Sequence, residues 1–121
     1  MTTDLSRLLG RHYWMVLSTP TTHATAAAVD AQVADHVGWL LGLERQGILF
    51  ASGPLVQGPR VGAGSGMTLL RADSEADVHQ IAAEDPFVRA GLRTFEVYLW
   101  RLNEGSISIS VSLGTGTYEW D

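Results

Sequence analysis

Two helix-type patterns set among strand-type patterns constrain the fold of this chain more than any other feature. From about Thr25 to Arg45, apolar residues recur three and four positions apart, as on one face of an amphipathic helix. A second, shorter helix is predicted from a cap at Ser74 to Asp85-Pro86, because a residue before proline avoids the helical region. Strand-type runs lie before, between and after these helices. The sequence therefore predicts a mixed α and β domain.

The predicted strands give the order β-α-β-β-α-β. They are short apolar or alternating runs at residues 13–17, 48–51, 67–71 and 94–100. We expect the strand at 94–100 to be buried on both faces, since aromatic residues occur on both sides of its alternation. The order is that of an α+β, ferredoxin-like fold, with two helices on one face of an antiparallel sheet.

The glycine-rich segment 56–66 is predicted to be a loop or the turn of a hairpin. A phosphate cradle is the alternative, but it needs a helix to follow, and the next residues read as a strand.

The segment from Ser106 to Leu113 alternates serine with branched apolar residues and predicts an additional C-terminal strand. Its apolar face needs a cover, either by pairing with residues 94–100 through a turn at 103–105 or by crossing to another subunit. We favour a role in dimerisation. The expected organisation is one domain over residues 1–121, with a core at about 12–102 and a strand extension at 105–118. Because helices cover only one sheet face, we expect a homodimer in which a second copy covers the other face.

Composition excludes several classes of partner. The chain has 121 residues, a net charge of −5, only 8 Lys and Arg residues and no cysteine. No basic run is available for nucleic acid, and no segment is long and apolar enough to span a membrane. The absence of cysteine excludes a disulfide framework or a thiolate nucleophile. Residues 1–10 lack the apolar run of a signal peptide, so we expect a cytoplasmic protein.

His36 and Asp85 form the candidate site, because each ionisable group lies on a helix stripe that is predicted to be buried. His36 falls between Val33 and Leu40 on the first helix, and Asp85 falls four residues after Ile81 on the second. A buried carboxylate needs a partner, and imidazole is the natural candidate. A carboxylate that holds one ring nitrogen would make His36 a general base or acid near neutral pH.

Three features in this order resemble the YciI-like family of dimeric α/β-barrel proteins. They are the helix-borne His36, the strand that ends in Gly53-Pro54-Leu55, and Asp85-Pro86-Phe87 at the close of the second helix. The resemblance covers roughly residues 13–102 and implies a ferredoxin-like dimer with a His36 and Asp85 active site. One related branch of the family eliminates chloride from a chlorinated hydroxyhydroquinone, which suggests a reaction class and does not identify a substrate.

Each candidate residue also has an ordinary structural explanation. A helix histidine and an aspartate before proline often serve packing and helix capping. Ser52, Arg89 and Trp39 are candidate substrate-binding residues, although a turn serine, a solvated arginine and a packed tryptophan are the ordinary alternatives. His12, His23 and His79 lack the spacing of a metal site, and we expect neither a metal nor a cofactor.

Three functions remain open from the sequence. The first is a small cofactor-free lyase or isomerase that acts on an organic acid or phenol, with His36 as base and Asp85 as its orienting partner. The second is a non-catalytic small-molecule-binding or accessory module. In the third, His36 and Asp85 only stabilise the fold.

Overall fold

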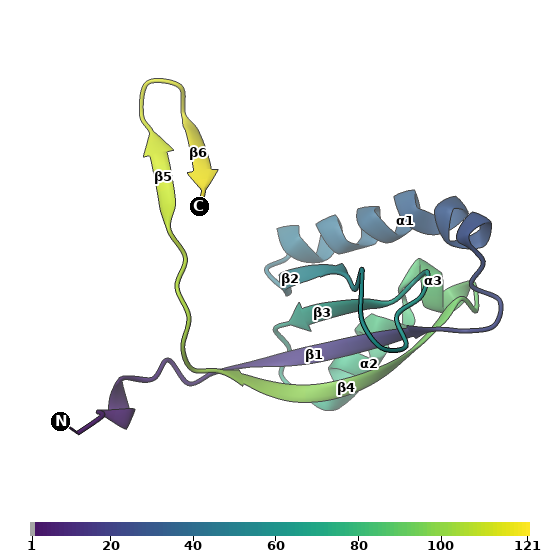
Figure 1. Cartoon of the computed structure of the whole chain (residues 1–121), viewed down its shortest axis with the longest axis horizontal. Coiled ribbons are helices and arrows are strands. Elements are labelled where there is room, and N and C mark those ends of the chain that lie inside the picture. Colours follow the sequence, from purple (N-terminus) through teal and green to yellow (C-terminus); the bar gives the residue numbers. More distant parts are fainter. Residues whose placement is uncertain (1) are drawn as a thin grey trace. The chain divides into compact units, whose positions relative to one another are not determined.

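The elements follow the predicted order, with three short additions: one at each end of the chain and one after the second predicted helix. The computed structural model describes residues 2–121. The elements are the 3₁₀ helix η1 (Leu5–Arg7), then β1 (Arg11–Pro20), α1 (Ala26–Arg45), β2 (Leu49–Pro54), β3 (Gly66–Leu70), α2 (Glu75–Ala83), α3 (Pro86–Arg89), β4 (Arg93–Leu102), β5 (Ile109–Ser112) and β6 (Thr117–Trp120) (Figure 1). They divide into two compact units, which are described separately below: His12–Arg101, and the terminal segments outside it.

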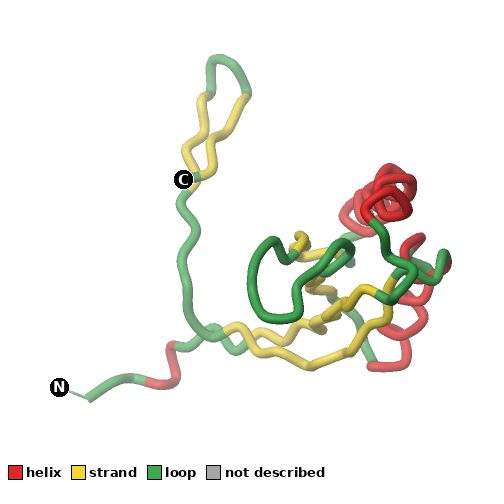
Figure 2. The backbone as a smooth tube through the Cα atoms, turned by 45° about the vertical axis from the view of Figure 1, so that its right-hand side comes forward, coloured by secondary structure: helices red, strands yellow, loops and turns green. Residues whose placement is uncertain are grey.

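A four-stranded sheet in the order β2-β3-β1-β4 forms the frame of the unit His12–Arg101. β3 is antiparallel to both β1 and β2, with Val16 of β1 opposite Thr68 of β3. The helices lie against this sheet as a separate layer (Figure 2). This is the ferredoxin-like α+β arrangement, so the predicted fold class is confirmed.

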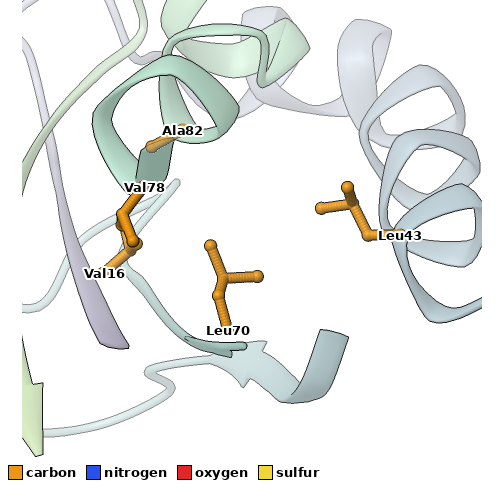
Figure 3. Close-up of a cluster of buried hydrophobic side chains, with 5 residues drawn as sticks. All are labelled: Val16, Leu43, Leu70, Val78 and Ala82. Carbon is orange, nitrogen blue, oxygen red and sulfur yellow. The ribbon is translucent and has the colours of Figure 1, made fainter. Parts of the chain in front are cut away.

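The hydrophobic core lies between the sheet and the helices. Its centre consists of five buried side chains from four elements: Val16, Leu43, Leu70, Val78 and Ala82. Leu70 of β3 lies between α2 and Leu43 of α1 and is 0% exposed (Figure 3). The apolar faces that result from the alternation of the strands and from the 3.6-residue period of the helices therefore pack against each other in one layer.

The first helix begins and ends close to the predicted residues. The Thr25 hydroxyl caps α1 by accepting a hydrogen bond from the N–H of Ala28 at 3.1 Å. Gly47 follows the helix with φ +75°, a left-handed conformation that glycine adopts without strain. The apolar stripe of α1 was predicted to pack against the sheet, but only part of it does. Val33 and Val37 remain 40% and 43% exposed.

The second strand runs further than the prediction of residues 48–51. β2 continues through Gly53 to Pro54, with an irregular register between Leu49 and Ala51. Proline is tolerated there because β2 is an edge strand, which has no neighbour on its far side within the described sheet. The glycine-rich segment that follows connects two antiparallel strands, so the predicted hairpin connection at 56–66 is confirmed.

Within the single chain, residues 94–100 are buried on one face only, and not on both faces as predicted. Phe95 and Val97 pack against the core, whereas Tyr98 and Trp100 are 46% and 39% exposed. The physical reason is that β4 is an edge strand, and the helix layer lies against one sheet face only.

The C-terminal strand exists, but it does not pair with residues 94–100, which was one of the two covers considered for it, and the favoured role in dimerisation stays a prediction. β5 pairs antiparallel with β6, not with β4, and the two form their own two-stranded sheet. The tight turn contains Gly116 at φ +67°. Ile109 faces Trp120 and Val111 faces Tyr118, which places these apolar side chains on one exposed face of the hairpin.

Across residues 2–121, the helices are all too short or too polar to cross a membrane.

Candidate active site

His36 lies in the middle of α1 and contacts a carboxylate that is 49 residues away in the sequence. Its Nδ1 atom lies 2.8 Å from Oδ1 of Asp85. The two side chains are 13% and 6% exposed, so the contact is shielded from water. Because an ionised carboxylate can only accept, the proton of this hydrogen bond is assigned to Nδ1, which leaves Nε2 as the basic nitrogen.

Asp85 also caps a helix that the sequence did not predict. The N–H of Phe87 donates to Oδ1 of Asp85 at 2.9 Å, and Pro86 occupies the first turn of α3. Asp85 thus follows the end of α2 and begins α3, because proline suits the first helical position and aspartate suits the cap. The capping role and the contact with His36 use the same carboxylate oxygen.

Arg93, at the start of β4, completes the charged group, and the sequence-based prediction missed it. Its terminal nitrogen Nη1 lies 3.4 Å from Oδ2 of Asp85, and the residue is 7% exposed. Burial lowers the pKa of the Arg93 guanidinium, and the nearby Asp85 charge opposes this shift. Its Nε atom is buried and has no hydrogen-bond partner among the described residues.

The ring of Phe87 contacts both the imidazole of His36 and the guanidinium of Arg93. It stacks on His36 with centroids 4.3 Å apart, and the guanidinium carbon of Arg93 lies 4.5 Å from its centroid. Stacking and cation–π contact therefore fix both polar groups against one aromatic side chain.

A cavity of about 360 Å³ borders this group, and His36, Phe87 and Arg93 belong to its lining. Its wall is mainly apolar, with the exposed part of the α1 stripe on one side. Besides His36 and Arg93, the polar residues of the lining are Ser52, Ser65 and Thr68. This size suits a small organic ligand, and apolar walls with a few polar groups are typical of such sites.

The loop between β2 and β3 contributes Gly64 and Ser65 to the cavity. A Cβ at Gly64 would lie 3.7 Å from Val29 and 3.9 Å from Pro20, so the loop packs against the start of α1 and the end of β1. The glycine-rich segment is thus one wall of the cavity.

The remaining candidates are placed differently. Ser52 lines the cavity, and its hydroxyl lies 3.0 Å from that of Thr68. Trp39 lies beside His36, with ring centroids 5.9 Å apart, but it packs against the core. Arg89 is exposed at the end of α3, so the cationic group at the cavity is Arg93 and not the predicted Arg89. Over residues 2–121, no three His, Asp or Glu side chains gather closely enough to hold a metal ion.

The sheet order and the single helix layer define the protein as a ferredoxin-like α+β domain. The chain belongs to the YCII-related domain family, whose model matches residues 13–101. This match confirms the resemblance drawn from the sequence, and it spans His36, Asp85 and Arg93.

A solved structure with a similar fold is the 5-chloro-2-hydroxyhydroquinone dehydrochlorinase from Burkholderia phenoliruptrix AC1100, in complex with 2,5-dihydroxybenzoquinone. The TM-score is 0.59 at 20% sequence identity, and the similarity covers 73% of this chain and 92% of the dehydrochlorinase chain. No curated protein matches the sequence significantly.

Proposed function

We propose that the protein is a small enzyme of the lyase or isomerase type, which uses general acid and base chemistry on a small organic acid or phenol without a cofactor. The observation that carries this proposal is the position of His36. Its Nδ1 contacts the buried Asp85, and the same side chain borders the cavity of about 360 Å³.

In the proposed reaction, Nε2 of His36 takes a proton from a phenolic hydroxyl or from a carbon next to a carbonyl. The electron pair left behind forms a new double bond. In an elimination, the bond to the leaving group breaks and that group departs with its electron pair. In an isomerisation, the proton returns to another carbon. Asp85 holds the imidazole in one tautomer and stabilises the imidazolium, but does not take the proton.

The dehydrochlorinase with the similar fold supports the elimination as the first reaction to test. Its name denotes the loss of hydrogen chloride, which is a proton and a chloride ion. The proposed roles of His36 and Asp85 supply the removal of the proton.

Chloride release from 5-chloro-2-hydroxyhydroquinone, followed by a panel of small hydroxylated aromatics and keto acids, tests the proposal. With a substrate found, His36→Ala should lower kcat by about 10²–10⁴-fold while circular dichroism shows intact folding. His79→Ala is the matched control, because His79 is half exposed, forms its ion-pair contact with Glu75 on α2 and does not line the cavity. Unchanged turnover in a folded His36→Ala variant would contradict the proposal. Saturable binding of a ligand that stays chemically unchanged would favour the alternative of a binding module.

We also propose that two copies associate through the sheet face opposite the helices. The support is that the alternation of β4 places the exposed Tyr98 and Trp100 on this face. Light scattering should give the mass of a dimer, and Trp100→Glu should give a monomer. A variant without residues 105–121 tests the favoured role of the C-terminal strand: a dimer would assign the association to the sheet face alone, and a monomer would assign it to the C-terminal hairpin. A monomeric wild-type protein would overturn this arrangement.

A further inference from the structure

Arg93 is a buried cation with most of its hydrogen-bonding capacity unused. Its side chain is 6% exposed, and its one ion-pair contact, with Asp85 at 3.4 Å, is long. A guanidinium carries five N–H donors, and the Nε donor has no partner within residues 2–121. Unsatisfied buried donors cost free energy, more so on a charged group, so this arrangement needs a compensating partner.

Asp85 supplies a partner for only one of the guanidinium nitrogens. Its Oδ1 accepts from the His36 ring and from the N–H of Phe87, and its Oδ2 accepts one long hydrogen bond from Nη1 of Arg93. The Phe87 ring holds the guanidinium on one side. The guanidinium is therefore fixed in place and paired with one carboxylate, while its Nε donor has no partner among the described residues.

The unused donors belong to a residue that lines the cavity. A Cβ at Gly66 would lie 3.6 Å and 3.8 Å from the two terminal nitrogens of Arg93, and 3.4 Å from the Gly53 carbonyl oxygen. Glycine at this position therefore leaves the end of the guanidinium without a side chain over it. Among the described residues that line the cavity, Arg93 is the one arginine and no carboxylate is present.

We propose that Arg93 binds the anionic oxygen of the ligand, so that the cavity selects small organic monoanions over neutral molecules of the same shape. The carboxylate of an aromatic acid and the oxygen of an ionised phenol share this chemistry. Both accept charge-assisted hydrogen bonds from the guanidinium, and the apolar wall strengthens the attraction. Ser52 and Thr68 belong to the same lining and share one hydrogen bond, so the hydroxyl that accepts in it keeps its own proton to donate to a second ligand oxygen.

This inference deepens the proposed function and uses the same cavity, but binding can be measured without turnover. The first experiment compares benzoate with benzamide by calorimetry on the wild-type protein. The two probes have nearly the same shape, so charge is the main difference. Benzoate should bind about tenfold more tightly, which is the effect of one charge-assisted hydrogen bond. Ionised 4-nitrophenol, compared with 4-nitroanisole, distinguishes a phenolate from a carboxylate preference.

Variants then test whether Arg93 is the residue that causes the preference for benzoate over benzamide. Arg93→Gln should abolish the difference between benzoate and benzamide, and Arg93→Lys should keep a reduced preference, since lysine retains the charge without the planar fork. Arg89→Gln removes an exposed arginine four residues earlier and should leave the wild-type ratio unchanged.

Equal affinity for the two probes, failure of both to bind, or a full preference in Arg93→Gln would overturn the proposal. The wild-type comparison decides the matter even if Arg93→Gln does not fold. An Arg93-dependent preference in a protein whose turnover does not need His36 would uphold the anion site and contradict the proposed enzyme. Turnover that needs His36, together with no Arg93-dependent preference for anions, would support the proposed enzyme and contradict the anion site.

Discussion

The ring of Phe87 lies against the imidazole of His36, with centroids 4.3 Å apart and planes inclined by 25°. The backbone N–H of the same phenylalanine donates to the carboxylate that contacts Nδ1 of His36. One residue of α3 therefore constrains the imidazole twice, through its ring and through its backbone. The first turn of α3 is the structural reason that His36 has a defined orientation.

The contact between His36 and Asp85 predicts the tautomer of the ring. In wild-type protein with a neutral ring, ¹⁵N NMR should show the proton on Nδ1 of His36. In Asp85→Asn the population of that tautomer should fall, because a neutral amide accepts a weaker hydrogen bond than a carboxylate does. A wild-type ring with its proton mainly on Nε2 would show that the contact does not persist in solution.

Truncating the central core residue should destabilise the fold strongly. Leu70 is fully buried, so Leu70→Ala should lower the free energy of unfolding by about 2–5 kcal/mol through lost contacts and a cavity. Leu113→Ala is the matched control, because Leu113 is 92% exposed, and it should change stability by less than about 0.5 kcal/mol. Urea unfolding measures both. Similar losses in the two variants would argue against this core.

The same substitution at two glycines should have opposite effects. Gly47→Ala places a side chain at φ +75° and should cost about 1–2 kcal/mol, whereas Gly38→Ala, on the exposed side of α1, should stabilise by about 0.5–1 kcal/mol. A Cβ at either position has open space around it, so backbone conformation is the only difference. Thermal unfolding of the two variants checks the signs. A loss of stability in both would mean that α1 does not tolerate alanine at residue 38.

Tyr98 should show an unusual titration. The Glu96 carboxylate accepts a hydrogen bond from the Tyr98 hydroxyl, which raises the pKa of the phenol above its usual value, and the glutamate charge adds to the shift. The raised pKa means that this contact stabilises the fold below about pH 10 and is lost as the pH rises through the shifted pKa.

Absorbance at 295 nm follows the titration of the phenol, with Tyr98→Phe identifying its share of the signal. Glu96→Gln should lower the pKa of Tyr98 towards the ordinary value. An identical titration in Glu96→Gln would contradict the assignment to Glu96.

The sheet and the helices could be predicted because local periodicity and core packing agree. The spacing of apolar residues over 25–45 and the cap at Ser74 lead to helices within one or two residues of the observed ends. The partner of the C-terminal strand could not be predicted in this way. Thr117 to Trp120 alternates as β5 does, and a short glycine-containing turn closes with less loss of chain entropy than a return to β4.

The candidate site, too, could be predicted from the sequence only in part. The sequence indicates His36 and Asp85 because both occur at helix positions that suit burial. Arg93 was missed because the predicted strand began one residue later. Extending the alternation by one residue places Arg93 on the same face as Phe95 and Val97, which is the signal that could have found it. The cavity itself depends on how the glycine-rich loop packs on α1 and β1, and no local pattern encodes this packing.

The exposed hairpin of β5 and β6 has a calorimetric consequence. Its apolar side chains are already 59–73% exposed in the folded chain, so unfolding changes their hydration little. The heat-capacity increment of unfolding should therefore match the 90 residues of His12–Arg101, at about 1.1–1.4 kcal/mol/K, and not the larger value of about 1.5–1.8 kcal/mol/K for 121 residues. The stability of the single chain should accordingly vary less steeply with temperature than its length implies.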